Sequence, residues 1–458
     1  MSILTIGMKH AGKGVSLLRK SVLCTKPQNI TSININKLKY VQNTGEDVFE
    51  LKNTATKINL QLKNVYNIES EISNPEISKR VLSTVEDYCN VNKNNNLFKG
   101  AKLKQDFLDN IDNPSTTSWD YNTKDISITF NENFDWKNLK QISQELYDNC
   151  EIPNNNPNFY IYRDCANILN FKHNPYAFHF NNSRHFVNGS ELDAYRLSDT
   201  SNILKFNSSY VAARMSGKKY PKALLTMFEE NGGNTNLKFP KPTPNRIIQG
   251  SIHHFKNQKD AINYLSKHYG IDGNFIDTKQ ANLFAGAVDD LSKALGSNEY
   301  FRGLKVSVDP TPFENTLTKM TLSWNYATGK AELFINPAYN WKNAKKLNVS
   351  DYDELFHPTI NPKDTYIHEL VHWLDFKGNP TRFGETEIAF SSGKTYYNQK
   401  GKIITAKVSS YAPKSPGEFH SEYISARMNG IKFPKAVDKE FEAGWNGPVL
   451  NFPDWQIN

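Results

Sequence analysis

Two histidines and a glutamate at helical spacing are the residues of this 458-residue chain best suited to catalysis. His368, Glu369 and His372 form the pattern His-Glu-x-x-His within the segment YIHELVHWLD. Residues four apart lie on one face of a helix, so both imidazoles can reach one metal ion with Glu369 beside them. A separate apolar stripe can face the core, and it comprises Ile367, Leu370, Val371 and Leu374. The pattern predicts a buried helix that carries metal ligands, and two merely packed or solvated histidines are the alternative.

A third ligand must come from elsewhere in the chain, because catalytic zinc usually has three protein ligands and one open position. A helix is expected to begin after Ser415, a suitable N-cap residue, with Pro416 at its first position. Glu418 and Glu422 share one face of it, so one can coordinate the metal while the other hydrogen-bonds a histidine ligand. Alternatively, Ser415 and Glu418 form a capping box, which would make Glu422 the better ligand. We expect His420 to lie at the surface, with a minor alternative role as a ligand.

The chain contains an internal repeat, which appears as three pairs of similar segments in the same order. LFKGAKL from Leu97 matches YFRGLKV from Tyr300, 203 positions later. SWDYNTKDISITFNENFDWKN from Ser118 matches SWNYATGKAELFINPAYNWKN from Ser323, 205 positions later. NSSYVAARMSGKKYPKAL from Asn207 matches HSEYISARMNGIKFPKAV from His420, 213 positions later. The slow drift of the offset indicates a duplication followed by short insertions.

The repeat predicts four parts. These are a basic leader free of Asp and Glu (1–45), a first domain (46–238), a proline-rich hinge (239–246) and a second domain (247–458). Each domain is long enough to bury its own core. Helices are predicted at Lys259–Tyr269 and Thr278–Leu295, and a β-hairpin at residues 323–336. The predicted fold class is therefore α+β, with two tandem homologous domains.

The first copy lacks every polar residue assigned to the metal in the second. At the offset of 205, His368, Glu369 and His372 face Arg163, Asp164 and Asn167. At the offset of 213, Glu418 faces Lys205 and Glu422 faces Ser209. The apolar positions of the predicted helix keep their character as Tyr162, Cys165, Ala166 and Leu169. A purely structural role for the histidines would not predict this joint loss, so the first domain is interpreted as a metal-free relative of the second.

The segment HELVHWLD, followed by Tyr411 seven positions before Glu418 in EFHSEY, resembles the catalytic domain of the anthrax lethal factor family of gluzincin metalloproteases. The resemblance implies two zincin-like domains, the second with an intact His-Glu-x-x-His site and the first serving in docking or delivery. It implies that His368, His372 and Glu418 hold Zn²⁺, which lowers the pKa of a bound water to about 7. Glu369 would accept the proton of that water.

The resemblance also implies roles for residues around the metal. Tyr411 would donate a hydrogen bond to the oxyanion, unless it only packs in its loop, and Glu422 would orient an imidazole. The strand Ala331–Ile335, if it forms the edge of the cleft, would pair with an extended peptide substrate. The expected function is zinc-dependent endopeptidase activity on a peptide or protein substrate. The alternatives are a different zinc hydrolase, or a non-catalytic structural or cargo protein of a virion or secretion assembly with a relict metal site.

Composition restricts the remaining classes of function. Hydrophobic residues make up 38% of the chain, enough for real cores, and the four cysteines include no Cys-x-x-Cys pair. The net charge of +8 is spread along the chain, so a nucleic-acid partner is not expected. No apolar run approaches the length of a membrane span. The acid-free leader suggests delivery of the protein by export, injection or packaging in a virion, with a delivery or assembly partner for the first domain.

Overall fold

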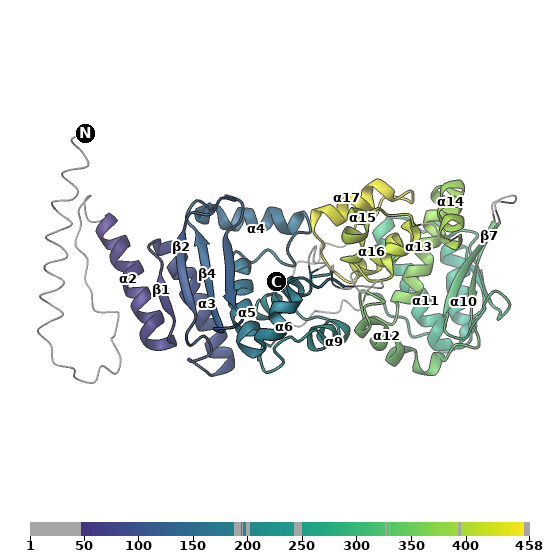
Figure 1. Cartoon of the computed structure of the whole chain (residues 1–458). Coiled ribbons are helices and arrows are strands. Elements are labelled where there is room, and N and C mark those ends of the chain that lie inside the picture. Colours follow the sequence, from purple (N-terminus) through teal and green to yellow (C-terminus); the bar gives the residue numbers. More distant parts are fainter. Residues whose placement is uncertain are drawn as a thin grey trace, which may run out of the picture. The chain divides into compact units, whose positions relative to one another are not determined.

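The computed structural model describes residues 47–452 apart from 187–193, 195, 198–201, 242–249, 326–327, 329 and 393–394. It has a mixed α+β architecture, as predicted, with helices packed against two small sheets (Figure 1). We call the described residues of 47–241 the first half and those of 250–452 the second half. The predicted leader and most of the predicted hinge lie outside the described residues. No described helix combines the length and the apolarity needed to cross a lipid bilayer.

The two halves contain corresponding series of elements. The first half comprises α2 (Asp47–Tyr66), β1 (Glu69–Glu71), α3 (Pro75–Asn92), β2 (Lys102–Asp106), β3 (Ser115–Asp120), β4 (Asp125–Asn131), η2 (Trp136–Asn138), α4 (Leu139–Asp148), α5 (Phe159–His173), α6 (Pro175–Asn181), α8 (Ile203–Met215) and α9 (Lys222–Glu230). The second half comprises α10 (Gln258–Tyr269), β5 (Asp272–Gly273), α11 (Thr278–Leu295), η3 (Glu299–Phe301), β6 (Lys305–Val308), β7 (Met320–Asn325), β8 (Lys330–Ile335), η4 (Trp341–Asn343), α12 (Ala344–Asp353), α13 (Asp364–Gly378), α14 (Pro380–Ser391), α15 (Gln399–Ala406), η5 (Ala412–Lys414), α16 (Pro416–Met428) and α17 (Lys435–Gly444).

Each half builds a four-stranded sheet with the same topology. The strand order is β1-β2-β4-β3 in the first half and β5-β6-β8-β7 in the second. In both sheets the first three strands are parallel, and the last strand pairs antiparallel as a hairpin. The predicted β-hairpin is thus confirmed as β7 and β8, although part of its turn lies outside the described residues. The condition stated for residues 331–335 is not met, because β8 pairs with a strand on each side and has no free edge for a substrate. The edge strand next to β8 is β7.

The helices repeat at the offsets seen in the sequence. Both ends of α3 and α11 differ by 203 positions, those of α5 and α13 by 205, and those of α8 and α16 by 213. Single interactions repeat as well. The indole Nε1 of Trp136 donates to the carbonyl oxygen of Asn131 at 2.8 Å, and that of Trp341 donates to Asn336 at the same distance. The duplicated sequence therefore folds into duplicated local structure, and residues can be compared position by position between the halves.

Local sequence signals explain where the helices of the second half begin and end. Helix α11 begins after Asp277, whose side chain accepts from the backbone N–H of Gln280, and ends at Gly296, which has a φ of +68°. Glycine adopts this left-handed conformation without a steric penalty, and the residue closes the last turn of the helix. The predicted helix Thr278–Leu295 is confirmed residue for residue. Helix α10 begins one residue before its predicted start and also ends at a left-handed glycine.

Helix α13 lies in the core of the second half. All four residues of its apolar stripe are at most 1% exposed: Ile367, Leu370, Val371 and Leu374. The helix contacts α11, α14, α16 and β7. Because its neighbours fix it on several sides, the polar side chains between the apolar positions are held in place rather than left in solvent.

Candidate metal centre

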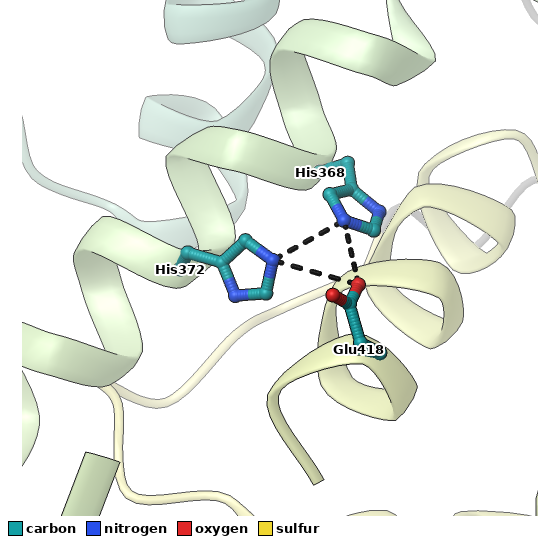
Figure 2. A group of neighbouring side chains, drawn as sticks. All are labelled: His368, His372 and Glu418. Atoms are coloured by element: carbon teal, nitrogen blue, oxygen red, sulfur yellow. Dashed lines mark hydrogen bonds and ion pairs between the residues drawn. The ribbon is translucent and has the colours of Figure 1, made fainter. Parts of the chain in front are cut away.

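Helix α13 presents two buried imidazoles toward α16 (Figure 2). His368 is 7% exposed and His372 is 8% exposed. Their Nε2 atoms lie 3.2 Å apart, and the ring planes make an angle of 80°. Two ring nitrogens directed at the same small volume are expected for ligands of one ion. Packing alone does not require the Nε2 atoms of two histidines to converge.

Helix α16 adds the carboxylate of Glu418 to the same volume. Its Oε2 atom lies 3.0 Å from Nε2 of His368 and 3.7 Å from Nε2 of His372. The three ligand atoms all lie within 4.8 Å of one another, and no second group of this kind occurs in the described part of the chain. These three side chains could therefore hold a metal ion.

The capping-box alternative describes only the backbone of Glu418. The hydroxyl of Ser415 accepts a hydrogen bond from the backbone N–H of Glu418 at 3.2 Å, so Ser415 is the N-cap as predicted. The carboxylate of Glu418 is directed instead toward the imidazoles and toward Tyr411. The N-cap thus sets the first turn of α16 and leaves the Glu418 side chain available to the site.

The electrostatics of this group favour a positive charge at its centre. Burial alone would lower the pKa of His368, yet its bonds to Glu418 and Glu422 raise that pKa well above the usual value. Burial alone would raise the pKa of Glu418, yet the two imidazoles hold it well below the usual value. A divalent cation would supply such a charge, because two neutral imidazoles and a carboxylate together carry one negative charge.

Tyr411 lies in the site and is not merely packed in its loop. Its hydroxyl donates to Oε1 of Glu418 at 3.0 Å. The ring contacts Phe356, at 4.5 Å between ring centroids, and the ammonium group of Lys414 lies 4.1 Å from the Tyr411 ring centroid. Burial and the charge of Glu418 raise the pKa of Tyr411, so the hydroxyl keeps its proton and remains a donor.

Glu369 is partly buried on the same helix as the two histidines. Burial raises the pKa of its carboxyl, and the nearby imidazoles of His368 and His372 oppose that rise. A carboxyl group with a raised pKa beside the ligands is suited to take up a proton near neutral pH. Its role as a base remains a prediction.

Glu422 lies behind His368, and sequence reasoning missed a second imidazole bound to it. Oε1 of Glu422 is 2.7 Å from Nδ1 of His368, as expected for an orienting carboxylate. The same oxygen is 3.0 Å from Nδ1 of His357, in the loop between α12 and α13. Motif spacing gives no signal for His357. The internal repeat could have found it, because this histidine faces Ile152 in the first copy.

Glu387 of α14 is a second residue that sequence reasoning missed. A β-carbon added at Gly417 would lie 2.8 Å from Oε1 of Glu387 and 3.5 Å from Nδ1 of His372. The absence of a side chain at Gly417 therefore leaves room for both groups. Burial raises the pKa of Glu387, and the charge of His372 opposes the rise. Nothing in the local sequence connects a carboxylate in α14 with the ligands.

The expectation that His420 lies at the surface is wrong. His420 is 1% exposed, and its Nδ1 lies 2.8 Å from Oδ2 of Asp375, which is also buried. Phe441 and Trp445 pack against the imidazole. His420 therefore joins α16 to α13 away from the metal group, and the partner that makes its burial possible could not be predicted from a helical wheel.

The corresponding positions of the first half have other partners. Asp164 is buried and accepts a hydrogen bond from Ser115, while Asn167 donates to Thr117 at 3.1 Å. The guanidinium of Arg163 lies over the ring of Tyr160. Lys205 is exposed, unlike its counterpart Glu418. No group of metal-ligating residues is found in the described part of this half.

Comparison with protein-family models, with curated proteins and with solved structures finds no match to this chain. Its function must therefore be argued from the site itself.

Proposed function

We propose that this protein is a zinc-dependent endopeptidase of the gluzincin type, similar to the lethal factor family, and that its two halves are tandem zincin-like domains. The observation that carries the proposal is the convergence of His368, His372 and Glu418, from two helices, on one buried point. The resemblance in the sequence motif is a second support for the proposal.

The shape of the group supports zinc as the metal. Ligand atoms about 2.0–2.1 Å from a tetrahedral zinc ion lie about 3.3 Å from one another. The three separations in this protein are 3.0, 3.2 and 3.7 Å. Two imidazoles and one carboxylate also suit zinc, and three ligands leave the fourth position open. Zinc bound there would polarise a water molecule and bring the pKa of that water to about 7.

The residues of the chain divide the remaining tasks. Glu369 would accept a proton and pass it to the leaving amine of the substrate. Tyr411 would turn its hydroxyl from Glu418 toward the negative charge that develops on the carbonyl oxygen of the substrate. Glu422 would keep Nδ1 of His368 protonated, so that Nε2 is the ligand atom.

The substrate would lie along the open edge of the sheet. In the described residues β7 pairs with β8 on one side only, and it contacts α13. Backbone groups on its outer side can pair with an extended peptide, which places the scissile bond beside the helix that carries the ligands. The metal-free first half would serve in docking or delivery.

Metal analysis combined with peptide cleavage tests this proposal. The full-length chain is expected to bind one equivalent of zinc and to cleave members of a peptide library. Glu369→Gln is expected to keep the zinc and to lose cleavage by about 10²–10⁴-fold. Asp164→Asn, the corresponding change in the first half, is the matched control and should leave cleavage unaltered. A chain that binds no zinc would support a relict site in a structural or cargo protein instead. A zinc-bound chain that hydrolyses other substrates but no peptide would support a different zinc hydrolase.

A further inference from the structure

The structure assigns His357 to the metal centre as a positioning residue, which acts on the ligand His368 through the carboxylate of Glu422. This inference rests on the proposed metal site. It goes beyond that proposal because it adds a third imidazole, which is not itself a ligand, and gives it a defined task.

The hydrogen bonds of Glu422 are the first step of the argument. Glu422 is 1% exposed, so water cannot replace a missing partner of its carboxylate. Oε2 is buried without a hydrogen-bond partner. Oε1 carries both contacts, 2.7 Å to Nδ1 of His368 and 3.0 Å to Nδ1 of His357. His357 therefore supplies one of the two hydrogen bonds that hold this buried charge.

Proton positions follow from these contacts. An ionised carboxylate only accepts hydrogen bonds, so Nδ1 must carry the proton in both imidazoles. In His368 this tautomer leaves the lone pair of Nε2 free to bind a cation. If His357 is removed, Glu422 keeps a single donor and can rotate away from its position. The ring of His368 then loses part of the restraint that aims Nε2 at the site.

The loop that carries His357 is built to hold it there. Leu355 adopts a left-handed φ of +68°, and its carbonyl oxygen accepts from the backbone N–H and the hydroxyl of Ser410. The backbone N–H of Phe356 donates to the carbonyl of Asp351 at 2.7 Å. The ring of Phe356 packs on Tyr411. The same short loop thus joins His357 to the segment that supplies the tyrosine of the site.

The first half provides an independent observation. Its loop has the same length and the same left-handed residue, since Cys150 has a φ of +65° at the position of Leu355. Asn156 and Asn361 also correspond, and each side chain accepts from the backbone N–H two residues later. In this alignment of the two loops, His357 corresponds to Ile152, which is buried. Where the ligands and Glu422 are absent, the third imidazole is absent too, although the loop that would hold it is kept.

Zinc affinity of the full-length chain, measured by competition with a chromophoric chelator, tests this inference. His357→Ala and His357→Ile, which restores the residue of the first half, are expected to weaken zinc binding about tenfold, the lower end of the range for partners of metal ligands. His357→Asn places an amide N–H near the position of Nδ1 and should recover most of the affinity. The visible absorption bands of the cobalt-substituted chain should shift in His357→Ala and return in His357→Asn.

His253→Ala is the matched control. His253 is similarly half-buried and lies 2.7 Å from the carboxylate of Asp289 in α11, and neither residue belongs to the metal group. The substitution His253→Ala should lower the thermal stability of the metal-free chain without changing its zinc affinity. Unchanged affinity in His357→Ala, or an equal loss in His357→Asn, would overturn the inference. Zinc binding by a wild-type chain that cleaves no peptide would refute the peptidase proposal alone, because the readout is affinity and not activity.

Discussion

Helices α5 and α8 of the first half have the same lengths as helices α13 and α16 of the second half, yet among the described residues only the pair α13 and α16 brings together metal-ligating groups. The apolar positions agree, for example Ala166 with Val371 and Leu169 with Leu374, and all four are buried. The polar positions that form the metal group differ: His368, His372 and Glu418 correspond to Arg163, Asn167 and Lys205. Packing therefore determines the fold in both halves, whereas the site depends on a set of side chains that can change without altering the framework.

The two halves also treat buried charge differently. In the second half the carboxylates of Glu418 and Glu422 are paired with imidazoles, which keep them ionised. In the first half Asp164 is buried with a serine hydroxyl as its hydrogen-bond partner, and burial raises its pKa to about 6. The first half therefore lacks imidazoles that would stabilise negative charge in this helix pair, and the neutral form of the Asp164 carboxyl is favoured relative to an exposed aspartate.

The largest expected effect is the loss of a ligand. Glu418→Gln should weaken zinc binding by roughly 4 kcal/mol, about a thousandfold, which is one ligand's share of a typical zinc-binding free energy. Lys205→Gln changes the corresponding residue of the first half and should leave zinc affinity unchanged. Isothermal titration of both variants measures the difference. Equal affinities in the two variants would mean that the convergence on Glu418 does not serve a metal.

The second prediction concerns the pH dependence of stability in the first half. The pKa of Asp164 is about 6 in the folded chain, and an unfolded aspartate titrates near its model value of 3.8. Between these values the folded state binds more protons, so its stability falls as the pH rises from about 4 to 6. The fall amounts to at most about 3 kcal/mol. Asp164→Asn has no charge to bury and should lack this component.

Labelling of a buried thiol measures this effect in the first half alone. Cys89 is 1% exposed and lies in the same core as α5, and the second half contains no cysteine. The ratio of the Cys89 labelling rates, wild type over Asp164→Asn, should rise between pH 4 and 7. Glu369→Gln, the matched change in the second half, should leave the Cys89 rate unaltered. A ratio that does not change with pH would contradict the assigned burial of a carboxylate.

The sequence allowed the framework to be predicted because its signals are local. Caps such as Asp277 and Ser415 and the stop at Gly296 lie within one turn of the helix ends they define. The ligands on α13 were predictable from helical spacing, and Glu418 from the position of a second helix relative to a motif. Comparison of the two copies then identified which polar residues belong together.

The rest depends on contacts between residues distant in the chain. The bond of His420 to Asp375 spans 45 positions, and that of His357 to Glu422 spans 65. The role of β7 as the edge strand follows from the order of the sheet, which a hairpin pattern does not give. Helical periodicity also predicted His420 at the surface. Periodicity indicates on which face of a helix a residue lies, but not which other elements pack against that face.

The smallest expected effect separates stability from metal binding at a single position. Gly417 has Leu204 as its counterpart, so the fold itself tolerates a large side chain there. Gly417→Ala should raise the thermal stability of the metal-free chain by up to about 1 kcal/mol, because alanine has the higher helix propensity. The added methyl group would meet Glu387 and lie in contact with the ring of His372, so zinc affinity should fall severalfold.

Thermal unfolding in chelator and zinc competition measure the two quantities in the same preparation. Leu204→Ala in the first half should lower stability and leave zinc affinity unchanged. If thermal stability and zinc affinity both rise or both fall in Gly417→Ala, the effect of glycine on zinc affinity follows from helix stability and not from space beside the metal group. Opposite signs would show that glycine at position 417 lowers the stability of the second half and at the same time leaves room beside His372.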